Sequence, residues 1–331
     1  MRWRPPTGQL LELARSGKRG PTIWRPILLY LLVWVAELLL AAVVGFAVVL
    51  AVWLAETLRG QFDASDLTQG ALALLESEWA GYLGLPSFLL MWGLTWLFVR
   101  LWEQRPFQTI GLRPKNSRAG RWLKNWLRGA GLGAAMMGMT VICLAWLGLV
   151  QVEGGVRLNQ IGWLVPSLVF FLVQGSAEEV VHRGYLLPVL SARAGPWAGI
   201  LASSAMFALL HSLNPGLTGL GLLNLFLSGA FLAILTLREG DLWAAFGWHS
   251  AWNWVQGPIL GLEVSGDRSW ASHSLTDITA TGPSATWLSG GLFGPEGGAV
   301  VTAVLLLGIT LLLVWHHRRQ RLESGFQPTT A

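Results

Sequence analysis

The segment from residue 27 to residue 55 holds 29 residues and only one charged side chain, Glu37. Because about 20 apolar residues already cross a bilayer as a helix, this segment predicts a transmembrane helix. Only 12% of the chain is charged and 53% is hydrophobic, whereas roughly a quarter of a soluble domain is charged. Seven more apolar segments follow, at about 82–102, 130–150, 161–191, 196–213, 217–237, 241–261 and 298–315. The sequence therefore predicts an all-α integral membrane protein with about eight transmembrane helices in one bundle, and it excludes a soluble globule.

The basic residues predict how this bundle is oriented. Nineteen of the 23 Lys and Arg residues lie in the terminal segments or in the connections that share their side of the bundle. The opposite connections contain only Arg59, Arg157 and Arg268. The positive-inside rule therefore predicts that both termini are cytoplasmic. No nucleic-acid-binding motif accompanies the basic residues, so we expect the lipid bilayer, and no nucleic acid, as their partner.

The same features divide the chain into three parts. We expect a cytoplasmic basic tail over 1–26, a transmembrane bundle over 27–315 with its catalytic core at about 105–260, and a second basic tail over 316–331. The first tail lacks the apolar region of a cleavable signal peptide, which favours a multi-pass protein of the plasma membrane. The connection 261–297 is rich in Gly, Ser and Thr, and we expect it to form a loop with a short re-entrant piece around 287–295.

Ionisable and amide side chains inside the apolar segments gather in three of them. Such groups are costly at membrane depth, so each is a candidate functional residue. Segment 161–191 contains Glu178, Glu179, His182 and Arg183, segment 196–213 contains His211, and segment 241–261 contains His249 and Asn253.

Spacing along the helices predicts where four of these side chains meet. If the segments 161–191 and 196–213 form a hairpin, Glu178 and His211 each lie about 25 Å of helix from its turn. We therefore expect them to face one another deep in the bilayer. His249 and Asn253 are one helical turn apart on a shared face, and we expect them somewhat nearer the cytoplasm.

These four side chains suit the hydrolysis of an amide bond. That reaction needs a base for the attacking water, an acid for the leaving amine and donors for the developing oxyanion. Glu178 and His211 can supply the first two, and His249 and Asn253 can donate to the oxyanion. The lone cysteine, Cys143, rules out an intrachain disulfide and a CxxC redox or metal site.

Two alternatives remain open for the surrounding chemistry. Glu178, His211 and His249 would also suit a zinc ion with an open position for water, so metal-dependent and metal-free hydrolysis both fit the residues. No HExxH motif is present. Glu179 points about 100° away from Glu178 on a helix, and Arg183 one turn later is placed for a structural ion pair with it.

Three motifs in this order resemble a known family. Glu178, Glu179 and Arg183 form EExxxR, Phe207 and His211 form FxxxH, and His249 and Asn253 form HxxxN. Over about residues 105–255 the chain resembles the CPBP (Abi) family of intramembrane endopeptidases, which includes the type II prenyl-CAAX proteases and the bacteriocin-processing or immunity proteins.

The resemblance implies a role for each matching residue. Glu178 and His211 would activate the water, and His249 and Asn253 would stabilise the tetrahedral intermediate. The family is described both as metalloproteases and as glutamate-based enzymes without metal. We favour the second account, in which no cofactor is required.

His182 departs from the motif, in which this position is commonly aromatic. It lies one helical turn after Glu178 and so could tune that carboxyl group or add a metal ligand. The alternative is an imidazole that hydrogen-bonds to a backbone carbonyl or to water, which helix packing accommodates easily.

The sequence thus favours an intramembrane endopeptidase that cleaves a membrane-anchored or lipidated protein or peptide. A non-catalytic membrane scaffold or immunity factor on the same fold is the first alternative. A proton-coupled transporter is the second, because buried Glu and His also build proton relays. The chain lacks the internal repeat that many transporters contain.

Overall fold

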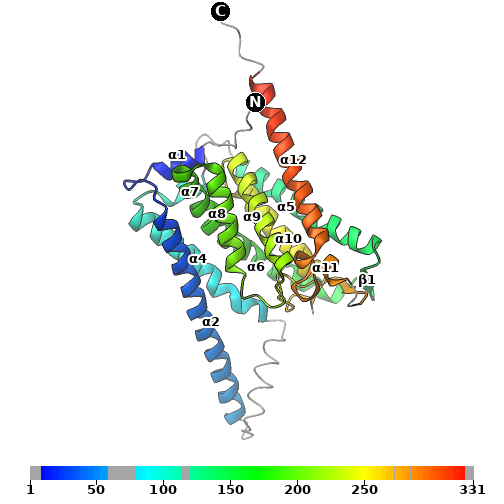
Figure 1. The fold of residues 1–331 in the computed structure, drawn as a ribbon. Coiled ribbons are helices and arrows are strands. Elements are labelled where there is room, and N and C mark those ends of the chain that lie inside the picture. The colour runs from blue at the N-terminus through cyan, green and yellow to red at the C-terminus, as the bar shows by residue number, and fades with distance from the viewer. Residues whose placement is uncertain (1–8, 59–79, 114–119, 272, 283–284, 325–331) are drawn as a thin grey trace, which may run out of the picture.

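Apolar helices form nearly all of the regular structure (Figure 1). The computed structural model describes residues 9–58, 80–113, 120–271, 273–282 and 285–324. Its longer helices are α2 (Trp24–Leu58), α4 (Leu85–Leu97), α5 (Arg121–Trp146), α6 (Ile161–Glu179), α8 (Pro196–Leu210), α9 (Gly219–Glu239), α10 (Trp243–Trp254) and α12 (Ala299–Ser324). Three short helices, α1 (Gln9–Arg15), α7 (Leu187–Ala194) and α11 (Thr286–Ser289), complete the set together with the strands β1 (Val150–Glu153) and β2 (Asp277–Ala280).

Six helical stretches among the described residues are long and apolar enough to cross a membrane. They are Trp24–Ala55, Gly81–Trp102, Arg121–Trp146, Leu158–Ala194, Gly219–Glu239 and Ala299–Arg318. The predicted all-α membrane fold is therefore confirmed. Two of the eight predicted spans are shorter than expected.

These two spans correspond to α8 and α10, and each helix ends early for a local reason. Helix α8 has 15 residues and ends at Leu210, just before the turn that contains Pro215 and Gly216. Helix α10 has 12 residues and passes into a π-helical turn, Val255–Ile259, that contains Pro258. Hydropathy alone does not detect the end of α10, because most of the residues that follow it, Val255–Ile259, are still apolar.

The helices run between two faces of the molecule. One face carries both ends of the described chain, the α7–α8 turn and the α9–α10 turn, and Figure 1 shows this face at the top. We call it the terminal face. The opposite face carries the connections from α5 to α6, from α8 to α9 and from α10 to α12.

Small residues let α5 and α10 pack backbone against backbone. A Cβ atom at Gly129 would collide with the carbonyl oxygen of Ala244, and one at Gly133 would collide with that of Trp248. A Cβ atom at Gly247 of α10 would likewise collide with the carbonyl oxygen of Trp126. Glycines four residues apart promote such close helix packing in membranes. This contact fixes α10, the helix that carries His249 and Asn253.

The connection after α10 contains more structure than the sequence predicted. Strand β2 pairs with β1 in an antiparallel two-stranded sheet, so part of the expected loop is a strand. The four residues of α11 lie where a re-entrant piece was expected. Local composition did not predict β2, because its partner lies more than 120 residues earlier in the chain.

The predicted N-terminal tail also contains structure. Helix α1 buries Leu10, Leu11, Leu13 and Ala14. Ala14 lies four residues after Leu10 and three after Leu11, so the three side chains share one face of the helix. That face packs against the bundle, where Leu11 and Ala14 belong to the two largest apolar clusters. The segment 9–15 is therefore part of the folded molecule.

Candidate active site

The first motif lies where α6 changes its helical geometry. Helix α6 ends at Glu179 and continues as a π-helical turn, Val180–Leu186, before α7 begins. Single π-helical turns inside α-helices occur frequently at functional sites. The turn follows Glu178 and Glu179 directly, and it changes the register of the residues that come after them.

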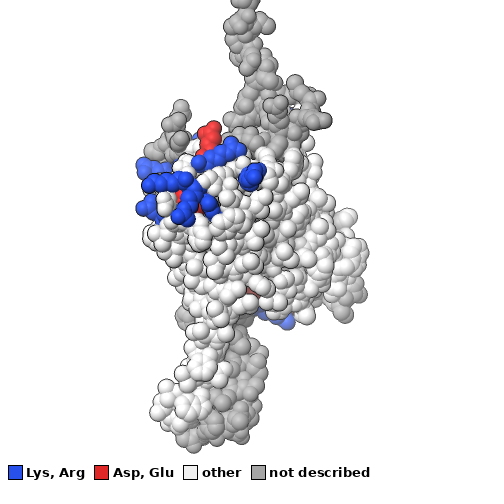
Figure 2. All heavy atoms as spheres, turned by 60° about the vertical axis from the view of Figure 1, so that its left-hand side comes forward, with Lys and Arg blue, Asp and Glu red and all other residues white. Residues whose placement is uncertain are grey.

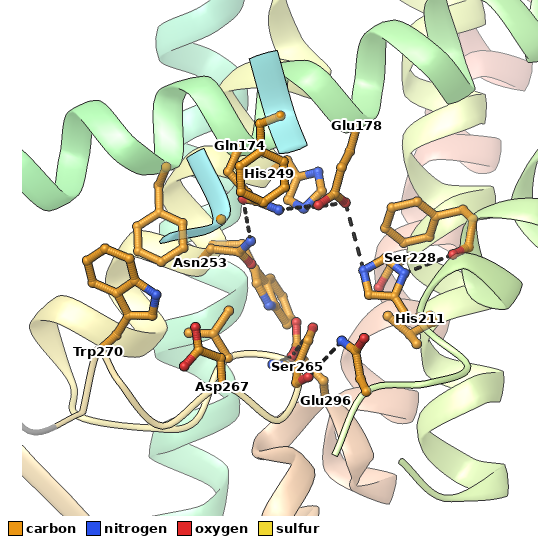
Figure 3. Close-up of a pocket in the computed structure, with 18 of the residues that line it drawn as sticks. Gln174, Glu178, His211, Ser228, His249, Asn253, Ser265, Asp267, Trp270 and Glu296 are labelled. Carbon is orange, nitrogen blue, oxygen red and sulfur yellow. Dashed lines mark hydrogen bonds and ion pairs between the residues drawn. The ribbon is translucent and has the colours of Figure 1, made fainter. Parts of the chain in front are cut away.

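Glu178 is buried and lines a cavity (Figure 3). Its Oε1 accepts a hydrogen bond of 2.5 Å from Nε2 of Gln174. Its Oε2 has no hydrogen-bond partner among the described residues. The Nε2 atoms of His211 and His249 each lie 3.8 Å from this oxygen. Two imidazoles from two other helices thus face the same carboxylate oxygen.

His211 is oriented by its own helix end. It directly follows α8, and its Nδ1 lies 2.9 Å from the carbonyl oxygen of Phe207, the other residue of its motif. A carbonyl oxygen can only accept, so Nδ1–H is the donor in this bond. In a neutral imidazole, Nε2 then carries the lone pair and faces Glu178.

Glu179 connects the first motif with the third. Its Oε1 accepts hydrogen bonds from Nη1 of Arg183, at 3.0 Å, and from Nδ1 of His249, at 2.9 Å. The guanidinium of Arg183 also lies 4.5 Å from the ring centre of Phe207. The predicted ion pair is present, but the interpretation that Glu179 has only a structural role within its helix is incomplete. This side chain also orients His249.

Asn253 is linked to Glu178 through a residue that the sequence analysis did not identify. Nδ2 of Asn253 donates a hydrogen bond of 2.9 Å to Oε1 of Gln174, whose Nε2 donates to Glu178. Gln174 lies one helical turn before Glu178, in the stretch 161–177, whose other residues are apolar or small. That spacing was the available signal for its involvement.

His182 lies outside the cavity. Its Nδ1 is 2.8 Å from the carbonyl oxygen of Glu178, and its ring packs edge-on against Phe207. This is the arrangement expected of an imidazole that hydrogen-bonds to a backbone carbonyl. An influence of His182 on the chemistry of Glu178 stays a prediction.

The cavity has a volume of about 260 Å³ and an aromatic wall. Its lining includes the aromatic residues Phe88, Phe170, Phe171, Phe207, Trp248, Trp252 and Trp270. The connections on the face opposite the termini add Asn214, Ser265, Asp267 and Glu296, which the sequence analysis also missed. They lie outside the apolar segments, so no cost of burial in the membrane marked them in the sequence.

Glu296 is the most buried of these added residues. Its Oε2 accepts hydrogen bonds from the backbone N–H and from the hydroxyl of Ser265, at 2.6 and 2.8 Å. Burial raises the pKa of the Glu296 carboxyl group despite these two bonds, which favour the ionised form. The cavity therefore contains a second buried carboxyl group besides Glu178.

The two pairs of residues meet at one site. Nε2 of His249 lies as close to Glu178 as that of His211 does, and the difference in depth between the pairs stays a prediction. Asn253 is the second-last residue of α10, at the end away from the terminal face. Length along a helix gives depth only when the helix is not tilted, and tilt is set by packing.

The side chains around Glu178 are of the types that bind zinc. Two imidazole nitrogens and one carboxylate oxygen are a common zinc set. In the part of the chain that the structure describes, no group of three or more His, Cys, Asp and Glu side chains is placed to hold a metal ion.

Comparison with known proteins supports the motif assignment. Residues 160–255 match the family model described as "Type II CAAX prenyl endopeptidase Rce1-like". This segment contains all three motifs, and the match confirms the predicted resemblance. Searches of curated proteins and of solved structures found no significant match.

Proposed function

Given this family match, we propose that the chain is an intramembrane endopeptidase that hydrolyses a peptide bond of a membrane-anchored or lipidated protein or peptide. One observation carries the proposal. Beside an aromatic cavity, the Oε2 of Glu178, which accepts no hydrogen bond among the described residues, faces the Nε2 atoms of two histidines, each at 3.8 Å. This separation exceeds a direct hydrogen bond, and in the proposed reaction the attacking water is in contact with all three groups.

In the proposed reaction Glu178 acts first as the base. The water oxygen attacks the carbonyl carbon of the substrate while the Glu178 carboxylate takes one proton from the water. His211 accepts a hydrogen bond from the same water through Nε2 and orients it. The proton then passes from Glu178 to the amide nitrogen as the C–N bond breaks, which yields a carboxylic acid and an amine.

His249 and Asn253 are the proposed donors to the oxyanion. With Nδ1–H held by Glu179, a protonated His249 donates through Nε2–H toward the cavity. Asn253 has two amide N–H donors, and Gln174 takes one of them, which leaves the other for the oxyanion. Donors fixed in this way need little rearrangement as charge develops.

No step of this reaction requires a metal. We therefore expect hydrolysis to continue, within about a factor of two, after dialysis against a strong zinc chelator. Loss of activity that added zinc restores would contradict the metal-free reaction and would support binding by Glu178, His211 and His249.

For the orientation, we propose a multi-pass protein of the plasma membrane with both termini in the cytoplasm. Lys and Arg gather at the end of the molecule where α1 lies, as Figure 2 shows, and basic residues favour the cytoplasmic side. The lipid on the substrate can be a prenyl group or another chain, since a lipid anchor of any kind would bring a peptide to this bundle.

A library of lipidated fluorogenic peptides tests the proposed function. The purified protein is assayed in detergent beside Glu178→Gln and a control, Glu263→Gln, whose carboxylate pairs with Arg268 outside the cavity. We expect peptide release by the wild type and the control only, with new termini identified by mass spectrometry. Equally folded proteins that all stay silent would favour the scaffold, and ion flux in proteoliposomes would favour the transporter.

A further inference from the structure

The cavity at Glu178 extends toward the face of the molecule opposite the termini. Its mouth is formed by residues at the ends of helices on that face. These are Gly81 and Gly84 before α4, Asn214 after α8, Asp267 and Trp270 after α10, and Glu296 before α12. Figure 3 shows Trp270, Asp267, Ser265 and Glu296 on the side of the cavity away from Glu178.

The mouth continues into a second depression at the surface. That depression is lined by Asn214, Pro215 and residues 264–269. Four of its residues, Asn214, Val264, Ser265 and Asp267, also line the cavity. Asp267 is exposed, so the shared wall reaches solvent. A path lined by polar groups thus leads from this face to Glu178.

Packed side chains close the route from the terminal face. Val180, Val181, Leu186 and Leu242 are fully buried, and they belong to one apolar cluster above the site. Nearer the terminal face, the fully buried Glu103 accepts a hydrogen bond from Tyr185, and Arg105 lies 3.4 Å from the same carboxylate. A peptide could approach from this side only if the bundle opened.

From these observations we infer that the substrate reaches Glu178 from the face opposite the termini, between Asn214 and the connection that carries Asp267 and Glu296. With the termini in the cytoplasm, that face is extracytoplasmic. The partner is then a peptide segment that projects from the outer side of the membrane. This inference deepens the proposed function and rests on it for the identity of the ligand as a substrate.

Accessibility of single cysteines tests the inference without relying on activity. Cys143 is replaced by Ser, and one cysteine is introduced at the mouth by Asp267→Cys or on the terminal face by Arg113→Cys. Both positions are exposed. Intact cells are treated with a membrane-impermeant sulfonated thiol reagent, and the unreacted thiols are then counted with a mass tag after denaturation.

We expect Asp267→Cys to be modified in intact cells, and Arg113→Cys only after permeabilisation. The reverse pattern would overturn access from the outside.

Hydrolysis by the Asp267→Cys protein is also measured before and after complete modification with a bulky reagent, and we expect at least a tenfold loss. Undiminished hydrolysis after complete modification of Asp267→Cys would overturn the access path. If Asp267→Cys is labelled from outside but the protein cleaves no peptide, the result would contradict the proposed function alone.

Discussion

At the residue scale, Glu179 joins two motifs that are far apart in the sequence. It binds Arg183 within its own helical segment and His249 on α10. The spacing of four residues predicted the first contact. No local pattern predicts the second, because it depends on how α10 packs against α6.

Glu179→Gln tests the positioning role of this carboxylate. We expect kcat to fall about 10- to 100-fold with little change in KM, because a neutral amide holds the His249 imidazole less firmly. Steady-state kinetics and thermal unfolding are compared with Glu103→Gln, which removes another fully buried, ion-paired carboxylate remote from the cavity. Equal losses of kcat in the two variants would contradict a specific role.

The two hydrogen bonds of Gln174 lead to a second prediction at this scale. Gln174→Leu removes both the donor to Glu178 and the acceptor for Asn253, so we expect kcat to fall about tenfold. The matched control is Ser167→Ala, which removes another buried link from α6, the hydrogen bond from Trp254. If both variants keep the wild-type kcat, Gln174 does not position the site.

At the scale of elements, the packing of α5 on α10 determines where His249 lies. Gly133→Ala places a methyl group against the carbonyl oxygen of Trp248, so we expect a loss of about 1–3 kcal/mol in stability and a lower kcat. Gly131→Ala on the same helix meets no atom within 4 Å and should keep both. Unfolding curves and kinetics of the two variants decide the question, and equal behaviour would contradict this account.

At the start of α10, the buried side chain of Asp241 makes the stability of the fold depend on pH. Asp241 accepts hydrogen bonds from the backbone N–H of Trp243 and from Asn125, yet burial raises its pKa from 3.8 to about 6. The folded protein therefore binds this proton more tightly than the unfolded chain. The contribution of Asp241 to stability is greatest below pH 3.8 and is lost as the pH rises to about 6.

Asp241→Asn should remove this dependence, because an amide does not titrate and can still cap the helix. The two pKa values differ enough to change the free energy of unfolding by about 3 kcal/mol across this window. Unfolding temperatures of wild type and variant between pH 4 and 7 provide the measurement. Parallel curves for the two proteins would refute the assignment.

At the scale of the whole molecule, charge divides the two ends. Lys and Arg gather near α1 (Figure 2), whereas the cavity is lined by Glu178, Asp267 and Glu296 and, among the described residues, by no Lys or Arg. A free C-terminal carboxylate close to the scissile bond would meet a cavity in which three carboxyl groups outnumber the protonated His249. We expect roughly tenfold higher kcat/KM for a C-terminally amidated peptide than for its free acid, shrinking as salt is added. Faster cleavage of the free acid would contradict this view of the cavity.

The sequence was sufficient for the membrane fold and for the two histidines that face Glu178, because ionisable side chains in apolar segments are rare and conspicuous. It was insufficient for the short helices α8 and α10, for the π-helical turn after Glu179 and for the cavity mouth. Those features depend on packing between helices and on loop residues such as Glu296. Neither leaves a periodic signal in the chain.

The central claim is that Glu178 and His211 act on the same water molecule. A double-mutant cycle with Glu178→Gln and His211→Asn, measured as kcat on one peptide, tests it most directly. We predict that each single substitution lowers kcat by at least about 10²-fold and that the double variant loses no more than the worse single one. Losses that multiply in the double variant would show that the two side chains act independently, and would contradict this account.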